Sequence, residues 1–389
     1  MLSTLRKPDL VRIYLIPLIT MLVSSMTWSI SIVYYLELGA TVTQVNMLRS
    51  IRTLMGTLLL VPMGALSDKY GRKYMVLYSR TVNLLGVTIH AYAQNLRHLY
   101  LASIVNGVAG RGFFPVLLSM IGDTATEEES QEAVSLLYLA SSIGLITGPT
   151  ITSLILDKEL TNLRGVYQIG VITQVTVLIY LATQIKETTT IDKQSKPSID
   201  QLKTLLTQKT YQNLSLMAIL YYFSRSTIET YTPIYAKTSL DYTDAQIALL
   251  STIRSTGILV IRLLSATILT QTHFQTLLYM FLALGGVAGL TAYIANSYTT
   301  IALAIILSGI SYGSIRILGA TLIAKQTTTR NRGLANSLYN VAISTGDITR
   351  TLTAPIVELV GIKPVFLLAT ISALTSTIPA KKLRNKENT

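Results

Sequence analysis

The sequence of 389 residues contains no cysteine, which excludes disulfide bonds and thiolate metal sites. Charged residues are also scarce, at 13% of the chain, whereas hydrophobic residues make up 50%. Acidic residues are the rarer sign, with 19 Asp and Glu against 32 Lys and Arg. Soluble domains average about 25% charged residues. The scarcity of charge therefore indicates a chain whose surroundings are themselves apolar.

Several motifs are absent as well. No nucleotide-binding loop ending in Gly-Lys-Ser/Thr is present, so transport driven directly by nucleotide hydrolysis is disfavoured. A membrane enzyme or a sensor would need a catalytic constellation or a soluble domain, and the sequence offers neither. We therefore expect no enzymatic activity and no cofactor or metal. The first apolar run has transmembrane length and lacks a small-residue cleavage site, so we expect it to be retained.

Long apolar segments recur along the whole chain. A bilayer core about 30 Å thick needs roughly 20 mostly apolar residues per helix. The pattern predicts an all-α polytopic membrane protein with twelve transmembrane helices, near residues 11–35, 43–66, 74–94, 98–121, 133–156, 164–185, 211–235, 245–269, 273–295, 299–322, 334–359 and 364–380.

The net charge of +13 raises the alternative of a nucleic-acid partner, and the positions of the basic residues decide the question. With the N-terminus in the cytoplasm, most basic residues outside the helices fall on the inner side. The outer loops then hold only Arg97, Lys158, Arg164, Lys237 and Lys363. The positive-inside rule places both termini in the cytoplasm. We therefore expect a multi-pass protein of the plasma membrane, acting as a monomer and without a nucleic-acid partner.

The chain divides near its middle, where residues 186–210 are polar and charged. This linker separates a bundle of six helices in residues 1–185 from a second in residues 211–389. Sliding the halves by one constant offset aligns Gln44 with Gln246, Arg52 with Arg254, Gly107 with Gly309 and Gly144 with Gly346. Chance can align two apolar segments, but one offset that serves four helix pairs favours a duplication. Transporters built from such repeats bind substrate near the bilayer midplane.

Residues 64–73 (GALSDKYGRK), at the end of the second predicted helix, form a basic loop. An acid at a helix C-terminus, such as Asp68, needs a cation such as Arg72 to compensate the helix dipole. The loop resembles the G-x-L-x-D-R-x-G-R-[RK] pattern of the major facilitator superfamily and departs from it only at Lys69. The resemblance covers the chain and implies two pseudo-symmetric six-helix bundles with alternating access. It also implies gating roles, for which the candidates are Gly64, Asp68, Gly71, Arg72, Lys73 and Asp123.

A second match lies in the fifth predicted helix, where Gly144, Gly148 and Pro149 resemble the G-x-x-x-G-P of the family's antiporter signature and are further gating candidates. Glycines four residues apart let a neighbouring helix approach closely, and the proline permits a bend. Ordinary helix packing is an equal alternative. The family's basic residue in the fourth helix is absent, because Ser103 stands in its place. That departure argues against transferring the proton relay of multidrug exporters.

Charges inside the predicted helices carry the substrate hypothesis, because each costs about 2.5–3.5 kcal/mol or more at a helix centre. Against many arginines, the deep positions hold only two acids, Glu229 and Asp347. Arginine stays charged and forks onto carboxylate, phosphate or sulfonate oxygens. We therefore predict an anionic substrate, although some arginines can instead bond to backbone carbonyls or to the two acids. The candidate substrate-binding residues are Arg52, Arg111, Arg225, Arg254, Arg316, Arg350 and Trp28.

Energy coupling is assigned to the same region. Glu229 and Asp347 are the deep candidates for a proton carrier, and exchange for a counter-anion is the alternative. The three histidines, His90, His98 and His273, fall near helix ends and are interpreted as interfacial. The sequence thus predicts secondary transport of a carboxylate- or phosphate-bearing anion. The competing hypothesis, which the Gly148-Pro149 signature favours, is a proton-coupled exporter of cationic or neutral amphipathic compounds.

Overall fold

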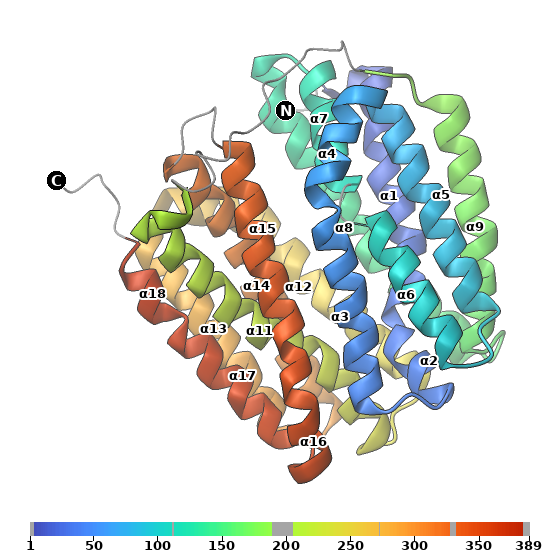
Figure 1. The fold of residues 1–389 in the computed structure, drawn as a ribbon, viewed down its shortest axis with the longest axis vertical. Coiled ribbons are helices and arrows are strands. Elements are labelled where there is room, and N and C mark those ends of the chain that lie inside the picture. The colour runs from blue at the N-terminus through green and yellow to red at the C-terminus, as the bar shows by residue number, and fades with distance from the viewer. Residues whose placement is uncertain (1–3, 111–112, 189–204, 272, 327–331, 384–389) are drawn as a thin grey trace. The chain divides into compact units, whose positions relative to one another are not determined.

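The computed structural model describes residues 4–110, 113–188, 205–271, 273–326 and 332–383, and the regular structure of these residues is helical (Figure 1). The chain divides into two compact units. The first unit contains Met1–Gln194 and Tyr242–Thr252, and the second contains Ser195–Asp241 and Ile253–Thr389. The first residues of the eighth predicted helix thus group with the first unit, whereas the sequence-based division assigned them to the second half.

Helices from η1 to α9 lie in the first unit. Its core packs apolar side chains of α1, α5, α7, α8 and α9 against one another, with Leu10, Leu117 and Leu137 fully buried. The helix bounds are η1 Thr4–Arg6, α1 Pro8–Ser29, α2 Ser31–Glu37, α3 Val42–Leu58, α4 Leu60–Tyr70, α5 Arg72–Ala91, α6 Leu96–Gly110, α7 Phe113–Thr124, α8 Glu127–Asp157 and α9 Leu163–Gln184.

The second unit holds the helices from α11 onward, with a core built around Met217, Leu282 and Ile315. One of these helices, α12, begins in the segment that groups with the first unit. The bounds are α11 Lys209–Thr238, α12 Asp244–Gln271, α13 Phe274–Ile294, α14 Tyr298–Gln326, α15 Arg332–Thr349, η2 Arg350–Thr353, α16 Ala354–Val360, α17 Lys363–Thr375 and α18 Thr377–Lys381.

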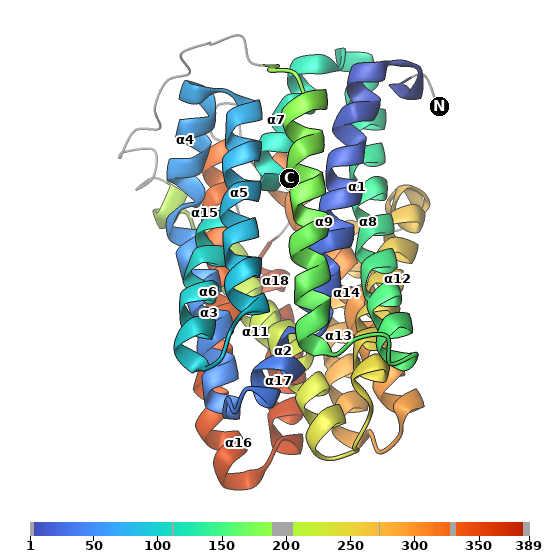
Figure 2. The same ribbon diagram turned by 90° about the vertical axis from the view of Figure 1, so that its right-hand side faces the viewer.

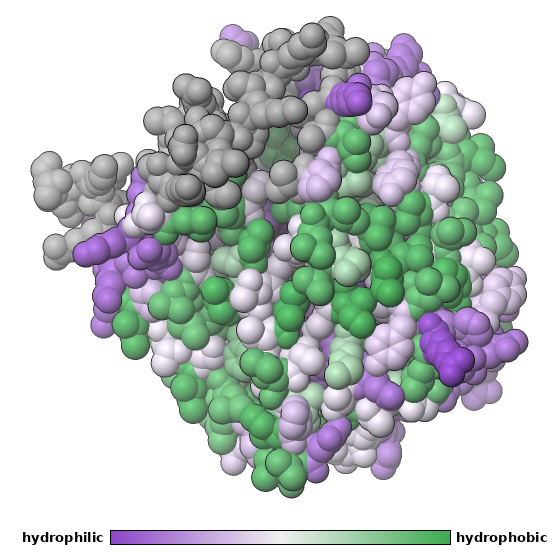
Figure 3. All heavy atoms as spheres, viewed as in Figure 1, coloured by the Kyte–Doolittle hydropathy of each residue, from purple (hydrophilic) through white to green (hydrophobic). Residues whose placement is uncertain are grey.

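Every predicted membrane helix coincides with one helix or with consecutive helical elements, such as α1 and α2, α3 and α4, or α15, η2 and α16. Among the described residues, 8 helical segments are long and apolar enough to cross a membrane. The predicted helices that fall short lie near 43–66, 74–94, 211–235 and 334–359, and each contains at least one arginine, namely Arg52, Arg80, Arg225 and Arg350 respectively. Green, hydrophobic side chains spread across the face in Figure 3, consistent with an apolar environment.

Matching local contacts support the proposed duplication. At the start of α3 the Thr41 amide donates to Gln44 at 2.9 Å and the Gln44 amide to Thr41 Oγ1 at 3.2 Å. At the start of α12, Thr243 and Gln246 make the same two hydrogen bonds at the same distances. Such reciprocal capping satisfies two amides that a helix N-terminus otherwise leaves unpaired. Two helix starts with one capping chemistry, 202 residues apart, support a repeated half.

Candidate functional site

Charged side chains from several helices meet in the second unit. Arg225 and Glu229, one turn apart on α11, form an ion pair. Glu229 Oε2 also lies 3.3 Å from Arg254 Nη2 on α12, and Arg225 Nη1 lies 3.4 Å from Asp347 Oδ1 on α15. The Tyr312 ring of α14 lies under both guanidinium groups, with its centroid 4.5 Å from Arg225 Cζ and 5.3 Å from Arg254 Cζ. We call these five residues the Glu229 cluster.

The Glu229 cluster is formally neutral, because two arginines face two carboxylates. Its charged side chains are only 11–13% exposed. Charges taken out of water at this level persist when they are paired and hydrogen-bonded. The Tyr312 ring adds cation–π attraction for both guanidinium groups. The arrangement therefore holds two cations beside each other through one shared carboxylate oxygen. In the described ranges, no group of three or more His, Asp and Glu side chains is placed to hold a metal ion.

Two further arginines of the predicted substrate set lie in the second unit. Arg316 Nη1 donates to Asn340 Oδ1 of α15 at 3.3 Å, and Arg316 is exposed. Arg350 is buried in η2, where its carbonyl accepts a hydrogen bond from Thr353 Oγ1 at 2.7 Å. The structure thus joins Arg225 and Arg254 with both predicted proton carriers, Glu229 and Asp347.

The remaining members of the predicted set belong to the first unit. Arg52 of α3 is half-buried and, among the described residues, makes no hydrogen bond or ion pair. Trp28 of α1 is 38% exposed. Arg111 lies outside the described residues. Arg80 of α5, which does not belong to the predicted set, is buried against the Phe113 ring, 4.0 Å from Cζ to the centroid, and donates to Ser79 Oγ at 3.2 Å.

One histidine was misplaced by the sequence analysis. His90 is not interfacial: it is buried in the first unit, 3% exposed. Its Nδ1 lies 2.8 Å from the Gly86 carbonyl and its Nε2 lies 2.9 Å from the Tyr35 hydroxyl. The ring stacks on Tyr167 at 5.1 Å. The sequence analysis overlooked the polar groups that can satisfy a buried imidazole, namely a carbonyl one helical turn away and a hydroxyl from a neighbouring helix.

Asn106 extends this network along α6, which lies beside α5 and α3 (Figure 2). Its Nδ2 lies 3.4 Å from His90 Nδ1, and its Oδ1 accepts from Asn83 Nδ2 at 3.1 Å. Gly86 makes room for it, because a Cβ there would stand 2.8 Å from Asn106 Nδ2. The result is a buried polar network built of neutral amides, a hydroxyl and an imidazole.

The predicted gating residues gather where α4 ends and α5 begins. Arg72 Nε lies 3.4 Å from Asp123 Oδ2, and its Nη1 donates to Ser67 Oγ at 3.0 Å. Gly71 has φ +102°, a conformation that glycine adopts without steric cost. The side chains at positions 64 and 68 lie outside the described residues. Lys73 Nζ donates to the Ala182 carbonyl at 2.9 Å, on α9.

Sequence reasoning missed an acid at this loop. Glu187 accepts hydrogen bonds from the backbone amides of Arg72, at 2.8 Å, and Lys73, at 3.2 Å. These are the first two amides of α5, where the helix dipole favours an anion. Glu187 follows α9 in the polar segment that was assigned to the linker. It therefore ties the start of that segment to the predicted gate.

The glycines of the predicted antiporter signature pack against α1. A Cβ at Gly144 would stand 2.8 Å from the Leu22 amide nitrogen, and one at Gly148 would stand 3.0 Å from that of Met26. Ser25 Oγ donates to the Gly144 carbonyl at 3.0 Å. Pro149 lies inside the continuous helix α8. The packing explanation thus has direct contacts behind it.

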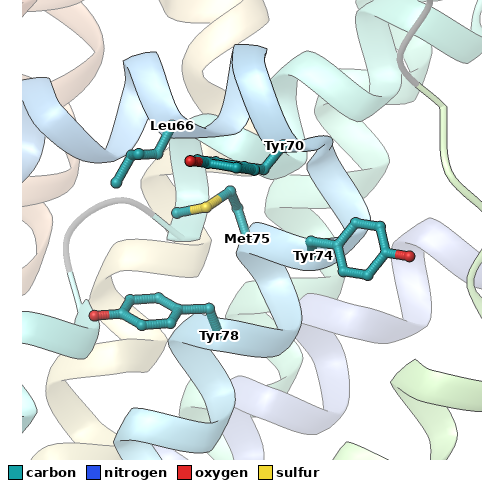
Figure 4. A pocket seen from close by; sticks show the side chains of 5 residues that line it. All are labelled: Leu66, Tyr70, Tyr74, Met75 and Tyr78. Carbon is teal, nitrogen blue, oxygen red and sulfur yellow. The ribbon is translucent and has the colours of Figure 1, made fainter.

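A hollow of about 430 Å³ opens between α4 and α5 (Figure 4). Leu66 and Tyr70 come from α4, and Tyr74, Met75 and Tyr78 from α5. The described residues that line the hollow are apolar apart from tyrosine hydroxyls and carry no charge. None of these residues offers the cation that an anion requires, and none belongs to the predicted arginine set.

The sequence matches known transporters. The family profile described as Major Facilitator Superfamily matches residues 13–346 and 214–388. The uncharacterized MFS-type transporter YwfA of Bacillus subtilis is 31% identical over 100 residues, 26% of this chain and 24% of that protein. The multi-drug resistance efflux pump PmrA of Streptococcus pneumoniae is 32% identical over 104 residues, 27% of this chain and 25% of that protein. The matched segments span about a quarter of each relative.

Solved structures resemble the whole chain. A POT family transporter in complex with 5-aminolevulinic acid superposes with a TM-score of 0.83 at 13% identity, covering 97% of this chain and 96% of that one. The human organic anion transporter MFSD10 (TETRAN) gives a TM-score of 0.68 at 13% identity, covering 96% and 99%. At such identities the likeness establishes the fold alone. Because the family profile matches most of this chain, the chain belongs to the major facilitator superfamily of membrane transporters.

Proposed function

We propose that this chain is a secondary transporter of small anions, with an organic carboxylate or phosphate as the cargo class. The observation that carries the proposal is the Glu229 cluster, in which Arg225 and Arg254 share one carboxylate oxygen of Glu229. Two guanidinium groups held side by side form the donor array that an oxyanion needs. The internal carboxylates occupy that array when no substrate is bound.

The same cluster links anion binding to protons. A carboxyl group loses its charge when it is protonated, so protonation of Glu229 removes the counter-charge of Arg225 and Arg254. The arginines then bind an external anion more tightly. By linkage, a bound anion raises the proton affinity of Glu229 to the same degree. Asp347, on the other side of Arg225, is the second candidate proton carrier. Exchange for a counter-anion needs no proton and is the alternative coupling.

Substrate exchange requires that access alternates between the two sides of the plasma membrane, where we place the chain as a monomer. We propose that all twelve predicted helices cross the bilayer, with both termini cytoplasmic. The contacts of Arg72 with Asp123 and Ser67 then form the latch on the cytoplasmic side. Gly64, Asp68, Gly71 and Lys73 belong to the same latch by their place in the loop.

The second candidate function is a proton-coupled exporter of cationic or neutral amphipathic compounds. It is favoured by the similarity to a protein named as a multi-drug resistance efflux pump and by the Gly144, Gly148 and Pro149 signature. The similarity covers about a quarter of the chain. The excess of arginines over acidic residues in the predicted helices argues against it, because like charges repel a cationic cargo.

Isothermal titration calorimetry on the purified full chain separates the two candidates. An anion transporter should bind small carboxylates or organic phosphates, with competition between unrelated anions and no competition from tetraphenylphosphonium. Tight binding of tetraphenylphosphonium that survives Arg225→Ala and Arg254→Ala, without any anion binding, would replace the anion proposal by the exporter.

A further inference from the structure

The duplication gives each arginine of the second unit a counterpart position in the first, and Arg52 corresponds to Arg254. Both lie on the second helix of their repeat, 202 residues apart, after identical capping contacts. A glycine packs on each: a Cβ at Gly107 would stand 3.2 Å from Arg52 Cα, and one at Gly309 would stand 3.3 Å from Arg254 Cα. Arg52 and Arg254 therefore have equivalent backbone surroundings.

A second pair of glycines shows which residues of α1 and α11 are equivalent in the two repeats. A Cβ at Gly144 would stand 2.8 Å from the Leu22 amide nitrogen, and one at Gly346 would stand 3.0 Å from that of Phe223. Leu22 and Phe223 are thus equivalent. Six residues further along each helix, within α1 and α11, the equivalent pair is Trp28 and Glu229.

The two copies therefore differ in charge. Arg254 has Glu229 Oε2 at 3.3 Å. At the position equivalent to Glu229, Arg52 has Trp28, which carries no charge. By the same two alignments, Ser24 is equivalent to Arg225 and Leu145 is equivalent to Asp347. None of the ion-pairing partners in the second unit is therefore repeated in the first. In the described part of the chain Arg52 has no ion pair.

We propose that Arg52 and Trp28 form an anion-binding subsite of the first unit, which takes an oxyanion group attached to an aromatic or apolar body. A half-buried guanidinium group without a carboxylate partner needs a counter-ion, and a ligand carboxylate, sulfonate or phosphate supplies it. The Trp28 side chain is 38% exposed and offers a flat apolar face for the rest of the ligand. The proposal rests on the proposed anion transport and narrows the cargo to amphipathic anions.

Trp28 is also the reporter for this subsite, because the chain contains 1 tryptophan. We would titrate the purified full chain with benzenesulfonate, methanesulfonate and benzyltrimethylammonium while following tryptophan emission. Benzenesulfonate should change the emission and bind more tightly than methanesulfonate, which offers the charge without the ring. Benzyltrimethylammonium, which offers the ring with the opposite charge, should leave the emission unchanged.

Variants then separate charge from stacking. Arg52→Gln should weaken benzenesulfonate by at least about tenfold, as expected for a lost hydrogen bond to a charged group, and Arg52→Lys should recover part of the loss. Arg97→Gln, which removes an exposed arginine, should have no effect. By calorimetry, Trp28→Glu should abolish binding because it recreates the acid of the second unit, whereas Trp28→Gln should only weaken it. Melting temperatures identify any variant that fails to fold.

Unchanged benzenesulfonate affinity in folded Arg52→Gln and Arg52→Lys protein, with the affinity lost in Arg225→Gln, overturns the subsite and leaves anion transport in place. Equal loss in Trp28→Glu and Trp28→Gln overturns the charge comparison between the repeats. If the parent chain binds neither sulfonate nor any carboxylate or phosphate, the subsite and the proposed anion transport fail together.

Discussion

The backbone amide of Arg72 donates a hydrogen bond to Glu187 at 2.8 Å, across 115 residues of sequence. The first turn of α5 is thus capped by a side chain from the segment that follows α9, beside the predicted gate. Glu187 also accepts from the amide of Lys73. Movement of the gate and movement of this segment are therefore mechanically connected.

Replacing Glu187 should impair switching and spare substrate affinity. Glu187→Ala removes both capping hydrogen bonds and the favourable charge at the helix N-terminus. Glu187→Gln keeps an acceptor without the charge, so we expect an intermediate effect. Transport rate and equilibrium affinity would be measured on the same proteoliposome preparations. Glu37→Ala, at the exposed last residue of α2, is the matched control. Equal transport rates in the parent and Glu187→Ala would remove Glu187 from the gate.

Substitutions of the latch residues should impair transport more strongly than substitutions of Glu187. Arg72→Ala breaks the contacts with Asp123 and Ser67, and Asp68→Asn removes the acid of the loop pattern. Both variants should abolish or greatly slow transport while substrate binding stays measurable, because neither residue is placed at the substrate site. Vesicle uptake is the measurement. Normal turnover in both variants would rule out the latch assignment.

Coupling is tested at Glu229 and then at Asp347. Glu229→Gln cannot gain or lose a charge, so gradient-driven accumulation should fall while substrate exchange persists. In the parent chain, anion affinity should rise as pH falls, because protonation removes the counter-charge of Arg225 and Arg254; in Glu229→Gln this pH dependence should flatten. Asp347→Asn is the parallel variant. Accumulation at parental levels in both would exclude these acids as the proton carriers.

Substitutions at Arg254 and Glu229, which form an ion pair in the Glu229 cluster, should have non-additive effects on stability. Removing one partner of a buried pair leaves an uncompensated charge and costs about 3–5 kcal/mol. Arg254→Gln leaves Glu229 one remaining arginine, and Glu229→Gln leaves Arg254 without its acid. The double variant should lower the melting temperature by less than the sum of the single changes. Strict additivity across this cycle would show that the two side chains do not interact energetically.

Glycines that pack on a neighbouring helix should tolerate replacement by alanine less well than a glycine with open space around it. Gly144→Ala forces a Cβ to within 2.8 Å of the Leu22 amide nitrogen, so the helices must separate and the melting temperature should fall. Gly346→Ala should act alike, with a contact at 3.0 Å to the Phe223 amide nitrogen. Gly122→Ala is the control, since nothing lies within 4 Å of its added Cβ. A similar melting temperature for all three variants would contradict the packing role.

Helix positions could be predicted because the apolar segments and their polar breaks follow directly from the thickness of a bilayer. The Arg225–Glu229 pair was also accessible, since side chains four residues apart share a helix face. Contacts of Glu229 with Arg254 and of Arg225 with Asp347 depend on helix packing, for which one sequence carries no distance information. The constant offset that aligns four pairs of helices was the exception, because residues that match in a repeated sequence are expected to occupy equivalent places in the two halves.

His90 was misjudged for a related reason. Proximity to a helix end suggested an interface, but helix ends in a bundle are buried wherever another helix covers them. Tyr35 and Tyr167, which enclose the imidazole, come from α2 and α9 and are remote in sequence. Glu187 was overlooked because a charged linker was treated as solvated, whereas its carboxylate has a specific backbone partner. In both cases the deciding contacts are long-range.

Glycine packed directly on a neighbouring backbone leaves no rotatable side chain to take up movement. Gly144 and Gly148 set α8 against α1 in this way, and Gly346 sets α15 against α11. Such joints resist shear, so each helix pair is expected to behave as a stiff lever during the transport cycle. Elastic deformation is then left to contacts made through long side chains, such as Arg72 of the proposed latch and the arginines of the Glu229 cluster.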